Sequence, residues 1–386
     1  MLRRLLTVFV AVMALVLASL GPATAAPAPP SGDSSPTASA DASDDATTGA
    51  PDDATTGAPA DAPAGAATHA PVGAPADVAT EAPTDTPTDA PTDTPTDDAA
   101  TDAPVSEDTT PSLVSFTTLA DGSWGAEADL PAVAVLGVTW ADAAAVVELE
   151  MRSLTEGVWS EWEELHTEVT GVGVPGSEPA ALIGASSVQV RMTTPPTPAD
   201  LTIVDPGAKE SDDQPVQRSA ARSAAPAAPV ILSREAWGAD PALLAWTPAT
   251  GRIQGATVHH TAGSNNYTAE QVPAILRGIY FFHSVSRGWG DIGYNVLVDA
   301  YGRAWEGRAG GLDRATTGAH ATSFNGEMFG ISMMGDFNTV RPTEAAFDTL
   351  ARVIAWKADT SGWQAQTSVF VNGRTLPRVH GHQNVA

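Results

Sequence analysis

The chain has 386 residues, no cysteine and a formal net charge of −27. Residues 26–112 carry 17 acidic and no basic side chains, residues 113–205 carry 14 acidic and two basic ones, and residues 230–386 carry 12 of each. The lack of cysteine excludes a disulfide framework, and the acidity of the first two segments argues against nucleic acid as their partner, because both would repel phosphate. The near-neutral last segment leaves the charge of its substrate open.

The N-terminus has the pattern of an export signal. A basic start is followed by an apolar run over residues 5–20, and Ala23-Thr24-Ala25 fits a small-residue cleavage site. An uncleaved membrane anchor is the alternative, although the run is short for a helix that needs ~20 apolar residues to span a bilayer. We therefore predict a signal peptide over residues 1–25 and a secreted protein that meets the membrane only during export.

Two segments have compositions that favour linkers. Residues 26–111 are dominated by Ala, Pro, Thr, Asp, Ser and Gly, and Pro-Thr-Asp repeats with period four between Pro83 and Asp97. Proline at every fourth position blocks a helix, and the scarcity of large apolar residues leaves nothing to bury. We predict a disordered acidic spacer over residues 26–111 and a shorter linker over residues 206–229.

Residues 112–205 contain short runs of β-branched and aromatic residues between turn signals, which predicts a small antiparallel β-sandwich. The expected strands are 113–118, 132–140, 146–152, 158–165, 187–192 and 201–204. The tryptophans of this segment are expected mainly in its core, with a sugar-binding surface as the alternative. Trp159 and Trp162 differ by three positions, so on a strand they would face opposite sides.

Residues 230–386 alternate between strand and helix patterns, which predicts an α/β domain with a mixed β-sheet flanked by helices. Thr268 and Gln271 have capping-box spacing ahead of an amphipathic helix, and Thr343 can cap a second helix. The expected elements are a strand at 252–259, a helix at 269–285, a hairpin of 293–299 and 302–306, a strand at 330–334, a helix ending near 359 and a strand at 378–382.

Six of the eight histidines lie in this last domain, and four of them form two pairs. One pair is His259-His260, and the other is His380 with His382. Zinc takes neutral imidazoles in a tetrahedral set, and a catalytic zinc keeps one position for water. A lone histidine in such a domain is more often a packed residue, so the pairs alone indicate a metal site only moderately. One histidine from each pair is a candidate zinc ligand.

Seven ordered motifs make residues 230–386 resemble the peptidoglycan recognition protein family, also called type 2 N-acetylmuramoyl-L-alanine amidases. They are Ser-Arg-Glu-Ala-Trp-Gly-Ala (233–239), Val-His-His-Thr-Ala-Gly-Ser (258–264), Gly-Trp-Gly-Asp-Ile-Gly-Tyr-Asn (288–295), Trp-Glu-Gly-Arg (305–308), Gly-Ala-His-Ala (318–321), Gly-Ile-Ser-Met-Met-Gly-Asp (330–336) and Gly-His (381–382). The layout, with an acidic tail and a β-rich domain ahead of the amidase, looks like secreted actinobacterial members. The resemblance implies the amidase fold.

The resemblance also implies a reaction and the residues that carry it. His259 and His382 would be zinc ligands, and Tyr294 would act as an acid or donate to the oxyanion. Zinc would lower the pKa of its water from ~15.7 towards ~7 and so give a nucleophile at neutral pH. The amide between the lactyl group of N-acetylmuramic acid and L-alanine of peptidoglycan would be hydrolysed. Peptidoglycan is thus the implied partner, and the cell wall surface the implied location.

Four further residues are implied at the substrate groove, namely His260, His283, His320 and Arg308. For His260, and for His380, a supporting role in the fold is the favoured alternative. Ala309-Gly310 follows Arg308 where animal members carry a dipeptide related to stem-peptide choice, and it matches neither familiar form. The choice between diaminopimelate and lysine therefore stays open.

One departure from the family bears on catalysis. In the family a cysteine eight residues after the second histidine is the third zinc ligand, and this position lies beyond Ala386. We expect the sequence to be a piece of a longer chain that supplies this ligand. A non-catalytic peptidoglycan-binding protein is the alternative, and a surface protein that acts through its β-rich segment is a third reading.

Overall fold

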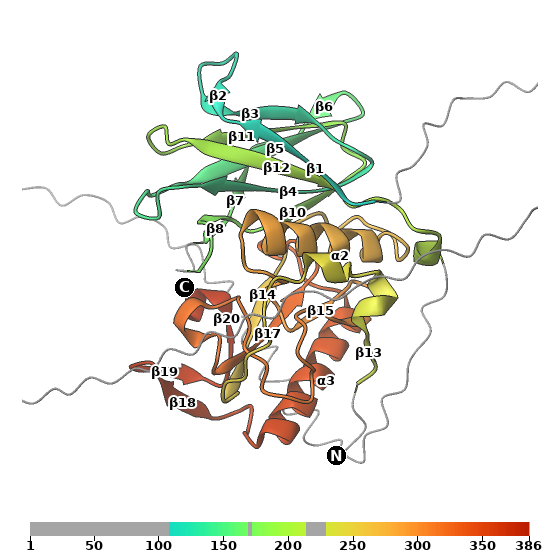
Figure 1. Cartoon of the computed structure of the whole chain (residues 1–386), viewed down its shortest axis with the longest axis vertical. Coiled ribbons are helices and arrows are strands. Elements are labelled where there is room, and N and C mark those ends of the chain that lie inside the picture. Colours follow the sequence, from blue (N-terminus) through green and yellow to red (C-terminus); the bar gives the residue numbers. More distant parts are fainter. Residues whose placement is uncertain (1–107, 169–171, 214–228, 386) are drawn as a thin grey trace, which may run out of the picture. The chain divides into compact units, whose positions relative to one another are not determined.

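A computed structural model describes residues 108–168, 172–213 and 229–385, which all lie within one compact unit (Figure 1). The predicted signal peptide, nearly all of the predicted spacer and most of the second linker lie outside the described residues. Within the described ranges, no helix combines the length and apolar character that crossing a membrane requires.

The β-rich segment, residues 108–205, folds into two antiparallel sheets. The first has the order β1 (Thr110–Ser115), β12 (Ala199–Asp205), β4 (Val133–Trp140), β9 (Gly176–Ser177) and β8 (Thr167–Glu168), with β10 (Ala180–Ile183) also on β4. The second has the order β2 (Thr117–Thr118), β3 (Trp124–Asp129), β11 (Ser187–Met192), β5 (Leu149–Thr155) and β6 (Val158–Trp159), with β7 (Glu163–Leu165) on β5. Buried side chains of both sheets share one core, such as Leu136 and Ile203 with Val188 and Met151. The predicted sandwich is confirmed.

The tryptophans of the β-rich segment divide between core and surface. Trp140 is buried, whereas Trp124, Trp159 and Trp162 are partly exposed. The guanidinium carbon of Arg152 lies 4.9 Å from the ring centroid of Trp159 and 4.5 Å from that of Trp162. The expectation that these two rings face opposite sides is therefore wrong. Strand β6 ends at Trp159, so the alternation of side chains does not continue to Trp162.

The C-terminal segment contains a six-stranded mixed sheet. Its order is β13 (Ile231–Leu232), β16 (Ala304–Glu306), β15 (Val296–Val298), β17 (Met328–Met333), β14 (Gly255–His260) and β20 (Val379–Gly381). Neighbouring strands are parallel except for the β15–β16 hairpin. Strand β17 is buried along its whole length, as a central strand covered on both faces must be. The α/β fold with a mixed sheet is confirmed.

Two helices cover opposite faces of this sheet. Helix α3 (Glu344–Ser361) shares a core with Val296 and Val298 of β15, whereas α2 (Val272–Phe281) shares another with Leu297. Adjacent residues of a strand point to opposite faces, so the two cores lie on the two sides of the sheet. Figure 1 shows α3 alongside the strands of this segment.

The two helices begin in different ways. The side chain of Thr343 accepts a hydrogen bond from the Ala346 amide at 3.1 Å and begins α3 as predicted. Helix α2 begins at Val272, later than the predicted start at residue 269. The Gln271 side chain accepts from the Thr268 amide at 2.8 Å in a turn that precedes the helix. At its other end, α2 continues into a π-helical turn, Phe282–Ser286.

Helix α2 also packs against the β-rich segment. Val135, Ala181 and Val204 of that segment share one buried cluster with apolar residues of α2, among them Val272, Ile275 and Ile279. A side chain at Gly278 would overlap Val135. The two segments thus meet through a continuous apolar core rather than through polar contacts alone.

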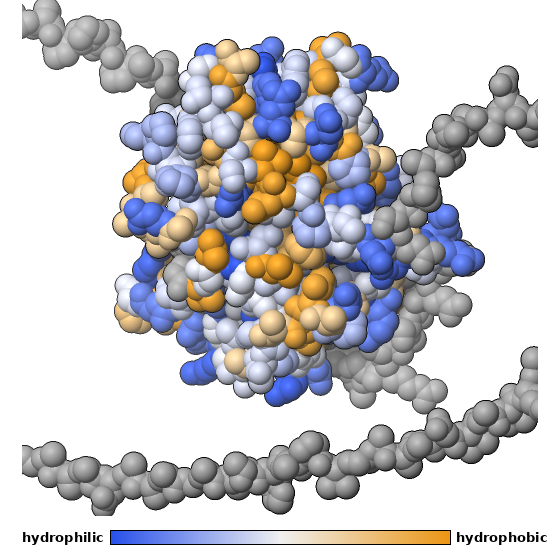
Figure 2. Space-filling view, turned by 45° about the horizontal axis from the view of Figure 1, so that its top comes forward, coloured by the Kyte–Doolittle hydropathy of each residue, from blue (hydrophilic) through white to orange (hydrophobic). Residues whose placement is uncertain are grey.

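A second hairpin, β18 (Ser368–Val371) and β19 (Arg374–Pro377), was not predicted. Phe370 on β18 is 71% exposed, and other exposed apolar side chains lie on distant elements, such as Leu113 on β1 and Val158 on β6. The face in Figure 2 likewise shows apolar residues in separate groups among polar ones. Scattered apolar residues of this kind are ordinary on a protein surface.

Candidate functional site

Strand β14 brings His259 and His260 to its C-terminal end. The strand lies between β17 and β20 and is parallel to both, so the C-terminal ends of three strands meet at one edge. Val258 pairs with Gly381, which places His382 beside His259 just past the end of β20. Ala262 then turns the chain away with a φ of 49°. Ligand sites in α/β sheets commonly form at such an edge.

Three other predicted site residues converge on His259, which is 5% exposed. Its Nε2 lies 2.9 Å from Nδ1 of His320. Its ring centroid lies 4.7 Å from that of His382 and 5.2 Å from that of Tyr294. The two proposed ligands and the proposed oxyanion donor, which come from three distant parts of the sequence, therefore share one cluster, in which His259 and Tyr294 are buried and His382 is half-buried.

The imidazoles of this cluster are neutral. Burial lowers the pKa of His259 well below its usual value, and the neighbouring His320 and His382 lower it further. Burial is also the main cause that lowers the pKa of His320 to about 3 and that of His382 below its usual value. Neutral imidazole is the form that binds zinc, so the electrostatics of the cluster suit that metal.

The hydrogen bonds assign the tautomers of the pair. Nε2 of His320 lies 3.2 Å from the carbonyl oxygen of Met328, which can only accept, so this nitrogen carries the proton. In neutral His320, Nδ1 is then an acceptor, and Nε2 of His259 donates to it. The lone pair that His259 retains is at Nδ1, which is the nitrogen available to a metal.

Two glycines hold the His320 ring in place. A side chain at Gly318 or at Gly330 would overlap the ring. The Asn325 side chain accepts from the His320 amide at 2.6 Å and orients the backbone. The motifs around residues 318 and 330 were recognised in the sequence. In the structure, the glycines of both motifs leave space for the His320 imidazole.

Replacing Gly330 by alanine is expected to displace His320 and to destabilise the protein by about 1–3 kcal/mol, the usual cost of overpacking a core. Urea unfolding measures the loss, and the His320 imidazole resonances report the displacement. Gly326→Ala is the matched control, because the added methyl meets only the Gly251 Cα, at 3.9 Å. Equal stability of the two variants would contradict the tight seat described for His320.

His283 and Trp289 form a wall beside Tyr294. His283 is 1% exposed, and its Nδ1 accepts from the Gly293 amide at 3.2 Å. Its ring centroid lies 4.5 Å from that of Trp289 and 5.5 Å from that of Tyr294. Burial, followed by Arg287 and Arg308, lowers the pKa of His283 well below its usual value. His283 is therefore neutral and sits directly behind the proposed oxyanion donor.

Arg308 lies next to this wall but is itself buried, at 3% exposure. Its guanidinium carbon is 3.9 Å from the ring centroid of Trp246, and one terminal nitrogen donates to the Ile292 carbonyl at 3.1 Å. Its Nε has no hydrogen-bond partner among the described residues, and burial lowers the pKa of Arg308 to about 10. A substrate contact by Arg308 stays a prediction.

The histidine of each pair that is not a proposed zinc ligand has contacts of its own. Nδ1 of His260 accepts from the Phe337 amide at 3.1 Å, and its ring centroid lies 5.9 Å from that of His166 in the β-rich segment. His380 is fully buried, with Nε2 3.0 Å from the Thr257 hydroxyl. Neither sequence pattern nor motif indicated His166 at this position, because it belongs to another segment.

The side chains of the cluster can be compared with the ligands that zinc requires. His259 and His382 offer neutral nitrogens side by side, which fits the metal's preference. Among the described residues, however, no group of three or more His, Cys, Asp or Glu is arranged to hold a metal ion. The described part of the chain thus offers suitable donors without a complete ligand set.

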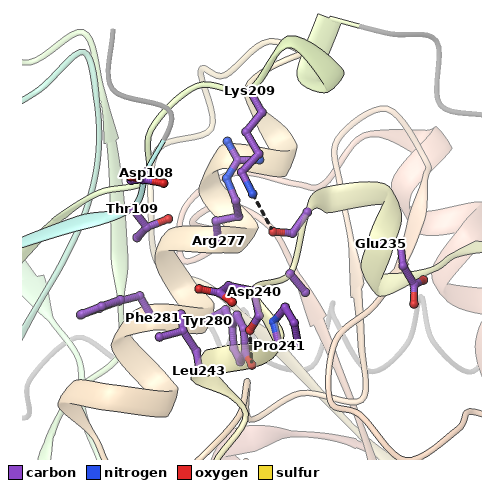
Figure 3. A pocket seen from close by; sticks show the side chains of 12 residues that line it. Asp108, Thr109, Lys209, Glu235, Asp240, Pro241, Leu243, Arg277, Tyr280 and Phe281 are labelled. Carbon is purple, nitrogen blue, oxygen red and sulfur yellow. Dashed lines mark hydrogen bonds between the residues drawn. The ribbon is translucent and has the colours of Figure 1, made fainter. Parts of the chain in front are cut away.

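A separate cavity lies away from this cluster. It has a volume of about 630 Å³ and none of the sequence-predicted site residues lines it. Figure 3 shows Arg277 and Lys209 on one side of it and Asp240, Tyr280 and Phe281 further along. The candidate site is therefore defined by its converging side chains and not by this cavity.

Comparisons with known proteins place the C-terminal segment. The family described as N-acetylmuramoyl-L-alanine amidase matches residues 249–386. Peptidoglycan-recognition protein SC1a/b of Drosophila simulans is 39% identical over 109 residues, which are 28% of this chain and 56% of that protein. The human N-acetylmuramoyl-L-alanine amidase is 32% identical over 125 residues, which are 31% of this chain and 21% of that protein. The chain thus spans little more than half of the first relative and about a fifth of the second.

Among solved structures, the wild-type Drosophila PGRP-LB is 26% identical, with 40% of this chain and 84% of that chain covered and a TM-score of 0.34. The family match falls on the segment that carries the histidine cluster. Residues 249–386 are therefore similar to the N-acetylmuramoyl-L-alanine amidase family and to peptidoglycan recognition proteins.

Proposed function

We propose that the protein is a secreted, zinc-dependent N-acetylmuramoyl-L-alanine amidase that acts on peptidoglycan. The observation that carries the proposal is the cluster of His259, His382, His320 and Tyr294 at the edge of the parallel strands. The family match and the human amidase support the same reaction. The export pattern of residues 1–25 supports secretion, which an enzyme of the cell wall needs.

Each residue of the cluster has a part in this proposal. His259 and His382 would hold the zinc, with a further ligand outside the described residues. Zinc would supply a Lewis acid that activates water at neutral pH. His320 fixes the tautomer of His259 through the bond between their ring nitrogens. Tyr294 would donate its hydroxyl hydrogen to the oxygen that becomes negative as the amide carbonyl is attacked.

The reaction predicts a specific pair of products. The C–N bond between the lactyl carbonyl carbon and the L-alanine nitrogen breaks, the hydroxyl of water goes to the carbon, and a proton goes to the nitrogen. Incubating purified protein with peptidoglycan should therefore release stem peptides with a free α-amino group on L-alanine, and chelation of zinc should stop the release. Mass spectrometry of the soluble products is the measurement.

Two results would decide otherwise. Sedimentation of the protein with peptidoglycan without any released peptide would favour the non-catalytic binding protein. New reducing sugar ends with intact muramyl peptides would identify a glycosidase instead and contradict the proposed reaction.

A further inference from the structure

Arg287, which follows the π-helical turn after α2, is the most deeply buried arginine next to the candidate site, at 0% exposure. Its Nε donates to the Val174 carbonyl at 2.8 Å and a terminal nitrogen donates to the Ser177 carbonyl at 2.7 Å. Its own carbonyl accepts from the Val174 amide at 2.9 Å. Burying a charge is costly unless it is hydrogen-bonded, so these contacts join the turn firmly to the β-rich segment.

The contact continues through Trp289. Its Nε1 donates to the Val172 carbonyl at 3.1 Å, and the Arg287 guanidinium carbon lies 4.5 Å from its ring centroid. Gly173 approaches so closely that a side chain there would overlap the Arg287 carbonyl, and its φ of 68° also favours glycine. Residues 172–177 of the β-rich segment therefore hold both the backbone and the indole of this loop.

The loop that contains Arg287 and Trp289 continues directly into the candidate site. The indole of Trp289 packs on His283, with ring centroids 4.5 Å apart and planes 34° apart. His283 accepts from the Gly293 amide, which precedes Tyr294. A side chain at Gly293 would clash with the Trp289 ring. The loop, the His283 imidazole and the backbone before Tyr294 are therefore closely packed.

The β-rich segment touches the other side of the site as well. Ser264, in the turn that follows the His259-His260 pair, donates its amide hydrogen to the Ala181 carbonyl at 2.7 Å. A side chain at Gly263 would overlap the backbone of Ala181. The turn after the proposed zinc ligand and the wall behind the proposed oxyanion donor are thus both fastened to the same β-rich segment.

We propose that the β-rich segment is a positioning element of the amidase site. Arg287 is the positioning residue through which residues 172–177 hold the wall of Trp289 and His283 in place beside Tyr294. This assigns the segment a role inside the catalytic unit rather than that of a separate wall-binding module. The catalytic consequence rests on the proposed function, whereas the positioning itself rests only on the contacts described.

Two buried arginines provide a matched test in the full chain. Arg277 on α2 is 3% exposed and donates to the Gly207 carbonyl at 2.9 Å and to the Asp212 carboxylate at 2.7 Å. It joins α2 to the chain that follows the β-rich segment, and its other hydrogen bonds go to the carbonyls of Pro206 and Trp237. Arg277→Met and Arg287→Met both remove a buried guanidinium, so both are expected to lower the thermal midpoint.

Only Arg287→Met is expected to loosen the site. Amide hydrogen exchange in residues 289–295 should accelerate by about 10-fold, the equivalent of one lost hydrogen bond of ~1.4 kcal/mol. The kcat for peptide release should fall by about 10–100-fold, as a small misplacement of site groups costs. Arg277→Met should leave both quantities within about twofold of the wild type at temperatures where both variants are folded.

Several outcomes overturn the proposal. Unchanged exchange in residues 289–295 of Arg287→Met would do so, and so would equal acceleration in both variants, which would indicate general loosening. If Arg287→Met does not fold, Trp289→Phe replaces it, since it removes the bond to the Val172 carbonyl and keeps an aromatic ring beside His283. A wild-type protein without amidase activity would refute the proposed function alone, because the exchange measurement does not depend on turnover.

Discussion

Replacing His259 by alanine is expected to remove bound zinc and to lower peptide release from peptidoglycan to the background rate. His259 is the centre of the cluster, with Nε2 donating to His320 and Nδ1 left to bind a metal. Without this imidazole, His382 and the further proposed ligand are too few to retain the metal at nanomolar zinc, because structural and catalytic zinc sites use three or four protein ligands. Zinc content by elemental analysis and release of free L-alanine amino groups are measured on the same preparation.

His380→Ala is the control for this variant. His380 lies on β20, which pairs with the strand of His259, and it is more deeply buried than His259, at 0% against 5% exposure. Its hydrogen bonds go to Thr257 and to the Pro377 carbonyl. Its loss should cost stability and leave the zinc content of the folded protein as in the wild type. If His259→Ala kept a full zinc content, His259 would not be a ligand, and the proposed site would have to be placed elsewhere.

The elements of the fold that could be predicted have either a regular spacing of apolar residues or a clear capping residue. The apolar spacing from Val272 to Phe281 predicted α2, and the Thr343 cap predicted the start of α3. Strand β11 was predicted with its observed ends, because Val188, Val190 and Met192 alternate with polar residues. These features act within one element, so no knowledge of the rest of the fold was needed.

The elements that were missed have weak local signals. Strand β3 reads Trp-Gly-Ala-Glu-Ala-Asp and strand β10 reads Ala-Ala-Leu-Ile, and neither favours a strand by composition. They are strands because β11 and β4 pair with them, which only the assembled sheet reveals. The β18–β19 hairpin was different, since Asn372-Gly373 between two short runs is a recognised turn signal that was overlooked.

The candidate site also contains features that could be predicted from the sequence and features that could not. His259, His382 and Tyr294 were named through motifs, and the parallel pairing of β14 with β20 brings the two histidines together. The bond between His259 and His320 could not be predicted, because 61 positions separate them and the ring is placed by Gly318 and Gly330. The contacts of residues 172–177 with Arg287 depend on how two segments pack, for which one sequence carries no local pattern.

Replacing Tyr294 by phenylalanine is expected to lower kcat by about 10²–10³-fold, the usual cost of losing one donor to a developing oxyanion. Tyr294 is 3% exposed, and its ring packs between His259 and His283, at centroid distances of 5.2 and 5.5 Å. The substitution removes one oxygen and keeps these ring contacts, so zinc content and KM should change little. Steady-state kinetics on a soluble muropeptide separate kcat from KM.

Tyr267→Phe distinguishes this effect from the loss of any buried hydroxyl. Tyr267 is 7% exposed, and its hydroxyl donates to the Met334 carbonyl at 3.0 Å and accepts from the Ala300 amide at 2.8 Å. Its removal should cost about 1–3 kcal/mol of stability, because the Ala300 amide is left unsatisfied, and should leave kcat unchanged. Tyr294→Phe should show the opposite pattern, with a large loss of kcat. An unchanged kcat in Tyr294→Phe would mean that the oxyanion is stabilised by other groups and that Tyr294 serves only as a packed ring between two histidines.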